Sequence, residues 1–317
     1  MGFHWITALL EWMARRGGVL LMGCVFVGVA LPPLAALLRD TLTITVAGLM
    51  TLVLLRIDLG QVLAYLRRPL LVGALLVWLL IACPLIAWAL VRAVGLEGPL
   101  GAALVIMATG CAATSSPAFA RLVGLDASIS LVVAVLSTLL VPFTAPPLAL
   151  GLMGIDLAIS VQGLMARLAL IVGLPLLLSL LIRRVVAPPR LAAWSGRIDG
   201  MVVLLLVIYG IGVMDGMQAM LLAEPAWVAG GIALAFLGNF GLNLLTTLAT
   251  LPAGRGVALA AGLLSGNRNM ALYLAVLPAA TDSRILLYFA LCQFPLFLSP
   301  MLLRPIYDRL RAAGLTK

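Results

Sequence analysis

Residues 262–276 read GLLSGNRNMALYLAV, in which Ser265, Gly266, Asn267, Arg268 and Asn269 interrupt a long aliphatic run. If this run crosses a membrane, Arg268 lies at a depth where a charge costs about 2.5–3.5 kcal/mol even on the mildest insertion scale. Unwound backbone is tolerated at that depth only where it is buried in protein or lines a cavity. The stretch therefore predicts a broken membrane helix with a polar centre.

Composition assigns the whole chain to the membrane. The 317 residues are 64% hydrophobic and 10% charged, with a mean hydropathy of +1.23. A soluble core does not need that much apolar sequence. The net charge of +9 does not indicate a nucleic-acid partner, because the arginines lie between apolar segments, as membrane topology requires. The four cysteines stand singly in apolar segments, so we expect no metal site, cofactor or disulfide framework.

Ten apolar segments have about the length that spans a bilayer. They lie at 18–38, 41–55, 70–91, 98–122, 127–153, 164–182, 200–222, 227–250, 256–279 and 285–303. The second segment is short and the fifth is long. The chain is therefore predicted to be an all-α polytopic membrane protein with ten transmembrane helices.

The basic residues support this assignment, because most of them fall on one side of the predicted spans. Of the 20 Lys and Arg residues, fifteen lie on the side of the N-terminus and four on the other, and Arg268 lies within a span. The four on the second side are Arg39, Arg92, Arg167 and Arg284. Because cytoplasmic loops carry the positive excess, both termini are predicted to be cytoplasmic, in a cell inner membrane.

The order of segments divides the chain into two similar halves. Residues 1–17 are expected to form an interfacial helix, and 18–153 the first five-helix repeat. Residues 154–199 hold the connection and the span 164–182, residues 200–306 the rest of the second repeat, and 307–317 a cytoplasmic tail. Five spans in each half would make the second repeat inverted relative to the first.

The fourth span of each half is interrupted at a corresponding place. In the first half, residues 108–122 read ATGCAATSSPAFARL, where Thr114, Ser115 and Ser116 precede Pro117. Proline lacks a backbone donor and biases the residue before it away from the helix. The second interruption is the one around Gly266. Paired interruptions of this kind point to the central site of a transporter.

Other polar residues within the spans have two interpretations. Asn239 and Asn243 lie one helical turn apart, and Gln293 lies in the last span. These amides either face a central cavity or join helices by hydrogen bonds. Asp215 lies near the outer end of its span and is expected to be interfacial.

The chain resembles the bile acid:sodium symporter family, in a superfamily that also includes arsenite permeases. The resemblance rests on GCAATSSP at 110–117, SISLVVAVLSTLLVPFTAPPL at 128–148 and GNRNMAL at 266–272, and it extends over about residues 18–306. It implies a panel domain and a core domain, with two broken helices that cross in the core. Substrate would bind near the crossing and in the cleft between the domains.

The sodium ligands that the resemblance implies are only partly retained. Ser116 and Ser130 fit the family's pattern, and Ser265 is a further remnant of the ion sites. Pro117 replaces a ligating asparagine, and Ala134 replaces a threonine. Sodium as a partner is therefore doubtful.

A second group of replacements relative to the family's pattern removes a negative charge and introduces a positive one. Leu264 replaces the glutamate that bridges both ions, and Leu79 replaces a glutamine from the third span. Arg268 stands in place of a second ligating glutamine. We therefore expect Arg268 to act as a tethered cation that substitutes for sodium, bonded to carbonyls near Ala113 and to the hydroxyls of Thr114 and Ser115. The alternative is that these internal bonds occupy Arg268 completely, so that it never meets substrate.

The predicted function is secondary transport of a small organic anion by alternating access, independent of sodium. The predicted substrate contacts are Thr114, Ser115, Arg268, Asn269, Asn267 and Gln293. The half-helices that start after each break would add a positive dipole end. The main alternative is an ordinary sodium-coupled symporter. A passive channel fits an inverted repeat poorly, and an intramembrane enzyme would need catalytic groups that the spans lack.

Overall fold

The computed structural model describes residues 4–57, 60 and 68–312, and these residues form helices and loops with a single isolated β-bridge. Residues 1–3 and 313–317 of the predicted terminal segments lie outside the described residues, as does Arg67 of the charge count. Seven described helices are long and apolar enough to cross a membrane, or eight if one bent pair counts as a span. The polytopic, all-helical class is confirmed, whereas the ten-span inverted repeat stays a prediction.

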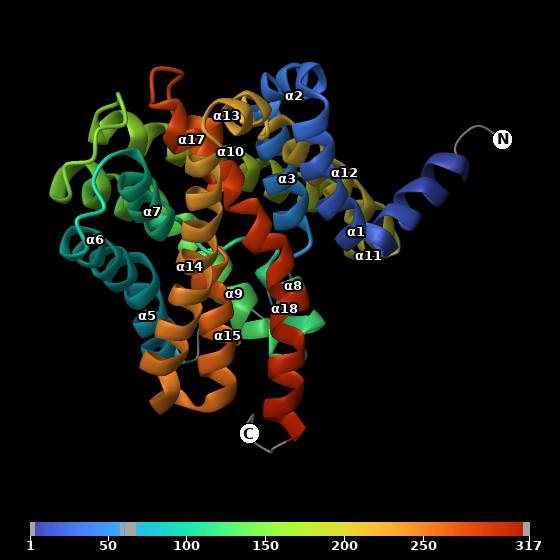
Figure 1. Ribbon diagram of the computed structural model, residues 1–317. Helices are drawn as coiled ribbons and strands as arrows, with labels where there is room; N and C mark the ends of the chain where they lie inside the picture. The colour runs from blue at the N-terminus through green and yellow to red at the C-terminus, as the bar shows by residue number, and fades with distance from the viewer. Residues whose placement is uncertain (1–3, 58–59, 61–67, 313–317) are drawn as a thin grey trace. The chain divides into compact units, whose positions relative to one another are not determined.

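The described chain, whose helices are labelled in Figure 1, folds into two units, and three helices have residues in both. These helices are α10 (Val161–Val185), α14 (Pro225–Thr250) and α16 (Met270–Val276). Unit 1 otherwise contains α1 (His4–Ala30), α2 (Pro32–Arg39), α3 (Leu42–Leu55), α11 (Pro188–Ala193), α12 (Ser195–Gly212) and α13 (Met217–Ala223).

Unit 2 contains both interrupted spans and the helices around them. In chain order these are α5 (Pro69–Val77), η1 (Trp78–Ala82), α6 (Cys83–Ala93), α7 (Pro99–Thr109), α8 (Ser116–Leu122), α9 (Ala127–Pro146), η2 (Pro147–Leu152), η3 (Leu251–Ala253), α15 (Arg255–Gly266), the first four residues of α16, α17 (Ser283–Leu291) and α18 (Gln293–Ala312).

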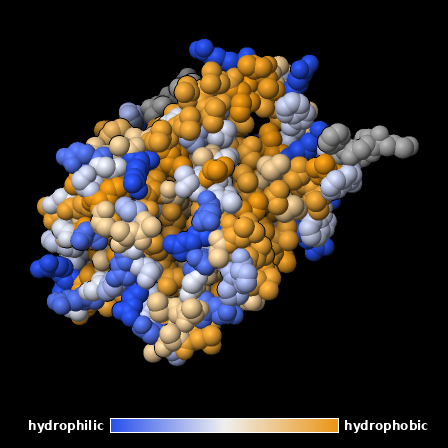
Figure 2. Space-filling view, turned by 90° about the horizontal axis from the view of Figure 1, so that it is seen from above, coloured by the Kyte–Doolittle hydropathy of each residue, from blue (hydrophilic) through white to orange (hydrophobic). Residues whose placement is uncertain are grey.

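The surface is that of a protein in lipid. Leu70 is 88% exposed, and Ile44 and Leu222 are each 78% exposed. Figure 2 shows broad hydrophobic areas on the face seen from above, with hydrophilic residues between them. In a membrane protein, aliphatic side chains this exposed face hydrocarbon, because the hydrophobic effect that buries them in water does not operate in lipid.

The first predicted span has different bounds in the structure. Helix α1 runs without interruption from His4 to Ala30, so the predicted interfacial segment and the start of the span 18–38 form one helix. It ends there because Pro32 disfavours helical backbone at Leu31. Helices α2 and α3 then form a pair bent by 69°. An interfacial position for residues 1–17 stays a prediction.

Glycines let α1 and α12 approach closely within unit 1. A Cβ added to Gly28 would lie 2.7 Å from the carbonyl oxygen of Ile211. A Cβ on Gly200 would overlap the backbone of Leu10. Membrane helices associate through such small residues because lipid supplies no hydrophobic drive between helices. This pair of helices forms the centre of unit 1.

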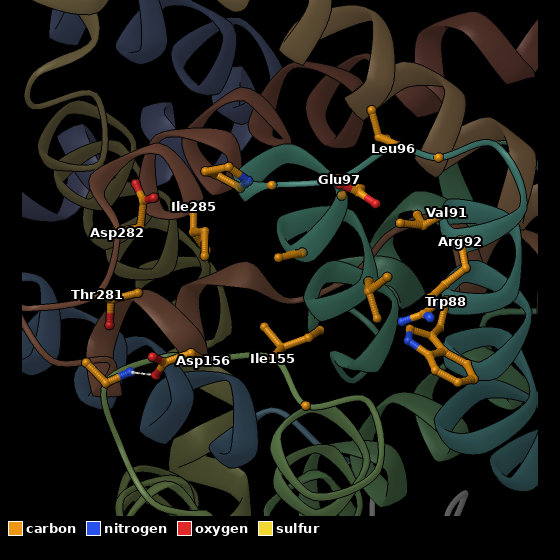
Figure 3. A pocket seen from close by; sticks show the side chains of 18 of the residues that line it. Trp88, Val91, Arg92, Leu96, Glu97, Ile155, Asp156, Thr281, Asp282 and Ile285 are labelled. Atoms are coloured by element: carbon orange, nitrogen blue, oxygen red, sulfur yellow. Dashed lines mark hydrogen bonds between the residues drawn. The ribbon is translucent and has the colours of Figure 1, made fainter.

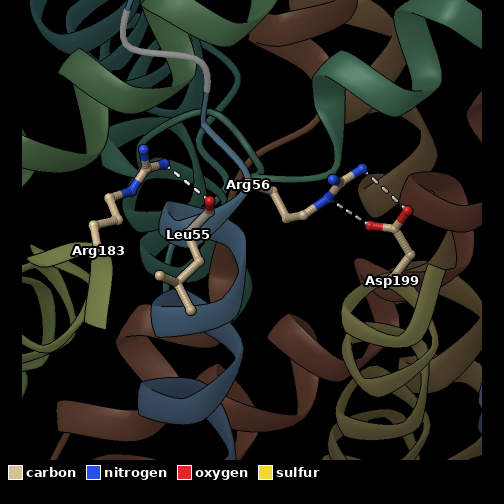
Figure 4. A network of polar contacts seen from close by, with 4 residues as sticks. All are labelled: Leu55, Arg56, Arg183 and Asp199. Carbon is tan, nitrogen blue, oxygen red and sulfur yellow. Dashed lines mark hydrogen bonds and ion pairs between the residues drawn. The ribbon is translucent and has the colours of Figure 1, made fainter. Parts of the chain in front are cut away.

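Arginines bind the polar ends of helices in unit 1 (Figure 4). Arg56 forms a two-point ion pair with Asp199, with N–O distances of 2.9 and 3.2 Å. Arg183 reaches three carbonyl oxygens at the end of α3 from its Nη2 atom. They belong to Leu54, Leu55 and Ile57, at 3.0, 2.9 and 2.5 Å. An arginine thus satisfies the carbonyls that a helix end leaves without donors.

Candidate functional site

The two broken spans cross within unit 2 and are held together by backbone hydrogen bonds. Ala112 and Arg268 form an isolated antiparallel bridge. The amide of Ala113 donates to the carbonyl of Asn267 at 2.7 Å, and the amide of Asn269 donates to the carbonyl of Cys111 at 2.9 Å. The extended segments therefore satisfy each other's backbone groups where no helix does. The two breaks therefore meet through their backbones, whereas a core domain in which two broken membrane helices cross stays a prediction.

Each break has its own local cause. Helix α8 begins at Ser116 with Pro117 in its first turn, where a missing backbone donor costs nothing. Helix α15 ends at Gly266, where an added Cβ would lie 2.5 Å from the carbonyl oxygen of Asn239 on α14. Gly266 is therefore needed for close packing against α14.

Arg268 lies buried at the crossing and donates to four oxygens. Its side chain is 3% exposed. Nε donates to the carbonyl of Ser265 at 2.7 Å, and Nη2 to the Ser265 hydroxyl at 3.2 Å. Nη1 donates to the carbonyls of Leu79 and Gly110 at 2.9 and 2.8 Å. Four of the five guanidinium N–H groups are therefore used inside the protein.

These partners differ from those expected from the sequence. Arg268 was expected to reach carbonyls near Ala113 and the hydroxyls of Thr114 and Ser115, but the bonds go to Gly110, Leu79 and Ser265. Among the described residues, no carboxylate pairs with Arg268. Carbonyl and hydroxyl oxygens, with the Cys83 thiol beside them, therefore surround the charge in this conformation.

The Leu79 carbonyl is available because of a π-helical turn that ends at a proline. In η1 the amide of Cys83 donates to the carbonyl of Trp78, five residues earlier. The next bond of this pattern would run from residue 84 to Leu79. Residue 84 is proline, which has no N–H. The third span therefore presents one carbonyl without a helical donor, and Arg268 supplies that donor.

The guanidinium also lies at the C-terminal ends of two half-helices. Gly110 is the residue that follows α7, and Ser265 belongs to the last turn of α15. Each helix C-terminus carries roughly half a negative charge. Two such ends and a free carbonyl form a site for one positive charge, and Arg268 occupies it.

The positions that the resemblance assigns to sodium ligands are largely apolar here. Leu79, Ala134 and Leu264 belong to one buried hydrophobic cluster, at 2%, 3% and 1% exposure. Ser116 is fully buried, and its hydroxyl has no hydrogen-bond partner. Ser130 makes a long bond of 3.4 Å to the carbonyl of Asp126. Hydroxyls thus persist at the first ion position, while the second is filled by leucine and arginine.

A buried amide network joins the second break to its neighbours. Asn239 donates from Nδ2 to the carbonyl of Gly266 at 2.8 Å and to Oδ1 of Asn267 at 3.1 Å. Ser299 donates to the same Asn267 oxygen at 3.0 Å. Asn239 therefore joins α14 to the break. Gln293 is 2% exposed and donates to the carbonyl of Phe289.

The crossing encloses little free space in this conformation. A cavity of about 10 Å³ lies against Arg268, Asn239 and Cys292, which is room for a single water molecule. Thr114 and Ser115 are half-buried, and Asn269 is 8% exposed. No cluster of three metal-ligating side chains occurs within the part of the chain that the structure describes.

Pro84 and Ser299 were not predicted from the sequence as residues of this site. Pro84 determines the free carbonyl of Leu79, and its signal was a proline six residues after a tryptophan in an otherwise regular span. Ser299 gave no signal, because a lone serine in a membrane helix usually bonds to its own backbone. Asn239 was named, but its partners could not be derived.

A family model described as Sodium Bile acid symporter family matches residues 43–225, which is more than half of the chain. The first break lies inside this segment and the second, with Arg268, lies after it. Comparison with curated protein sequences gave no significant match.

Proposed function

Because the chain belongs to the sodium bile acid symporter family, it is a membrane transporter, and we propose that it carries a small organic anion by alternating access without sodium. The observation that carries this proposal is the guanidinium of Arg268 between the C-terminal ends of α7 and α15. A permanent cation at this point makes a bound sodium ion unnecessary for holding the crossing together.

The apolar surroundings support the loss of sodium coupling. A sodium ion needs several hard oxygen ligands, and its charge is costly to bury without them. Leu264 and Ala134 offer none, and Leu79 offers only a carbonyl that Arg268 already uses. A second cation beside the guanidinium would also be repelled by it.

The substrate contacts that we propose first are those with some exposure, Thr114 and Ser115, together with Asn269. Hydroxyls and an amide can donate to an anion without burying another charge. Besides its four bonds to oxygens, Arg268 has a side-chain hydrogen bond with Cys83, so it would act on the substrate mainly through its field. Asn267 and Gln293 would then hold the crossing in shape. Residence in a cell inner membrane, with cytoplasmic termini, belongs to the same proposal.

An ordinary sodium symporter is the second candidate. The fully buried Ser116 hydroxyl without a partner favours it, because an ion or a water molecule could complete that hydroxyl's bonding. The two candidates differ in what drives uptake, since only the second needs a sodium gradient.

Uptake into proteoliposomes separates the two. A panel of radiolabelled mono- and dicarboxylates would be tested with an inward sodium gradient and with a matched choline gradient. We expect equal uptake under both gradients and a sharp loss in Arg268→Gln, whereas Arg121→Gln, at an exposed position, serves as the matched control. Uptake that appears only with sodium would favour the second candidate.

A further inference from the structure

A second and much larger cavity lies in unit 2, away from the residues of the crossing (Figure 3). Its volume is about 940 Å³, at the upper end of the range for small-molecule sites. Three connecting segments line it, at about residues 88–99, 154–158 and 280–285. Its lining is about equally polar and apolar, and the apolar residues include Val91, Val105 and Ile285. None of these residues belongs to the site described above.

This pocket lies at the ends of three candidate membrane spans. The spans Pro69–Ala93 and Ala127–Leu152 end beside it, and Ser283–Leu310 begins there. Such a place is the boundary between hydrocarbon and the headgroup layer. Leu90 on α6 is 57% exposed, and Val94, which follows α6, is 74% exposed. The helix that contributes Trp88, Val91 and Arg92 to the pocket therefore also exposes apolar side chains to lipid.

The pocket has a positive and a negative side. Arg92 lies over the ring of Trp88, with 5.7 Å from its guanidinium carbon to the ring centroid. Figure 3 shows these two on one side and Asp156 with Asp282 on the opposite side, with Glu97 between them. No salt bridge joins Arg92 to these carboxylates in the part of the chain that the structure describes.

The carboxylates keep acceptor capacity for a ligand. Asp156 accepts the amide of Ala158, and Asp282 accepts the amide of Arg284, each through Oδ1 at 2.8 Å. The second oxygen of each remains, and an ionised carboxylate offers about four acceptor positions. Arg92 offers a planar fork that matches two oxygens of a phosphate.

We infer that this pocket binds the headgroup of a zwitterionic phospholipid, with the phosphate on Arg92 and the ammonium among Glu97, Asp156 and Asp282. The acyl chains would extend from the pocket into the hydrocarbon layer at the ends of the three spans. Phosphatidylethanolamine fits better than phosphatidylcholine, because a primary ammonium donates three hydrogen bonds and a quaternary one donates none. This inference does not depend on the proposed substrate.

Other occupants fit less well. An anionic headgroup would meet three carboxylates and a single arginine. A soluble organic cation would leave Arg92 without a function. A soluble zwitterion would match the charges but would gain nothing from the exposed leucine and valine.

Lipid retention and stability test the inference on the full chain. The detergent-purified protein would be incubated with dioleoylphosphatidylethanolamine, with the phosphatidylcholine or phosphatidylglycerol of the same chains, or with soluble glycerophosphoethanolamine. Native mass spectrometry counts retained lipid, and thermal melting measures stabilisation. The variants are Arg92→Gln and the double variant Glu97→Gln with Asp156→Asn, which keeps the acceptor for Ala158. Arg121→Gln and Asp40→Asn are controls at exposed positions elsewhere.

We expect preferred retention of phosphatidylethanolamine and a rise in melting temperature with this lipid only. Each pocket variant should weaken retention about tenfold, the effect of losing one charge-assisted hydrogen bond, while the controls retain lipid as the parent does. Equal retention of phosphatidylglycerol, or pocket variants that behave as the controls do, would overturn the inference. Stabilisation by glycerophosphoethanolamine equal to that by the lipid would overturn the lipid as the occupant.

Discussion

Arg268 donates from Nη1 to the carbonyl oxygen of Leu79 at 2.9 Å, across 189 residues of sequence. The carbonyl is free because Pro84, five residues later, cannot make the bond that the π-helical turn would require. The third span therefore lacks one backbone donor for the Leu79 carbonyl, and Arg268 of the second broken span supplies a side-chain donor in its place. The cost of a buried unpaired carbonyl explains why this contact should matter.

A double-mutant cycle between Pro84→Ala and Arg268→Gln tests this complementarity. Alanine at 84 restores an N–H that can bond to Leu79, so removal of Arg268 should leave one carbonyl fewer without a partner. We expect Arg268→Gln to be less destabilising in the Pro84→Ala background, by about 1 kcal/mol. Thermal unfolding in detergent gives the four values.

Pro175 provides the matched control, because it also lies inside a helix, α10. A cycle between Pro175→Ala and Arg268→Gln should show additive effects. If the coupling free energy were the same in both cycles, loss of any proline inside a helix would have this effect. The specific link between Pro84 and Arg268 would then be refuted.

Sodium should not stabilise this protein. A ligand that binds the folded state raises the free energy of unfolding by RT ln(1 + c/Kd), where c is the free ligand concentration. Since the second ion position is filled by Leu264 and Arg268, melting in sodium chloride should equal melting in choline chloride. A reproducible rise of several degrees specific to sodium would contradict this expectation.

Restoring the ligands should restore part of the response. Leu264→Glu combined with Arg268→Gln returns a carboxylate and an amide to the family's positions, whereas Leu264→Gln with Arg268→Gln returns no charge. We expect a sodium-dependent rise in melting temperature only in the first pair. The response should stay partial because Pro117 and Ala134 remain.

The glycines of α15 should be intolerant of substitution for a packing reason. A Cβ on Gly262 would overlap the Thr247 hydroxyl and lie 2.7 Å from the Asn243 carbonyl oxygen. Gly262→Ala should therefore destabilise the protein by about 1–3 kcal/mol. Gly241→Ala on α14 has no atom within 4 Å of the added methyl group, so its melting temperature should stay the same or rise.

The positions of both breaks could be predicted because their causes are local. Pro117 and Gly266 mark the bounds of helical segments in the sequence, and in the structure α8 begins at Ser116 and α15 ends at Gly266. The partners of Arg268 could not be predicted in the same way. They depend on the register of a π-helical turn and on which helices meet at the crossing, and both follow from packing across distant parts of the chain.

The bounds of the first span were predicted incorrectly, although the cause is local in the sequence. Hydropathy alone placed it at 18–38, because residues 31–38 are as apolar as those before them. The structure ends α1 at Ala30 and starts α2 at Pro32. A proline preference outweighed the hydropathy signal at that point. Bounds taken from apolar runs alone are therefore least reliable next to prolines.

Topology can be tested independently of the site. Reporter fusions at Lys317 and within the loop 183–199 should both report the cytoplasm, because the basic residues gather on that side. A fusion in the segment of Asp156 should report the opposite side. A periplasmic signal at Lys317 would contradict the even number of spans and, with it, the inverted repeat.

Arg268 and Arg183 both donate hydrogen bonds to helix carbonyls, but in different surroundings. Arg268 reaches three carbonyls and a hydroxyl at 3% exposure, and Arg183 reaches three carbonyls at a half-buried position. Arg183→Gln should cost little, because water can replace the lost donors at the end of α3. Arg268→Gln should cost about 2–4 kcal/mol, because Leu79 and Gly110 are buried and their carbonyls would lose a donor.

Arg268→Lys separates the charge from the geometry. Lysine keeps a positive charge at the ends of α7 and α15, but a single nitrogen cannot match the planar fork, so stability should fall between those of the parent and of Arg268→Gln. Thermal unfolding and anion uptake would be measured for each variant. Equal stability of Arg268→Lys and Arg268→Gln would mean that the charge itself contributes nothing. If Arg268→Gln were as stable and active as the parent, the tethered cation would be the wrong explanation for an arginine inside this span.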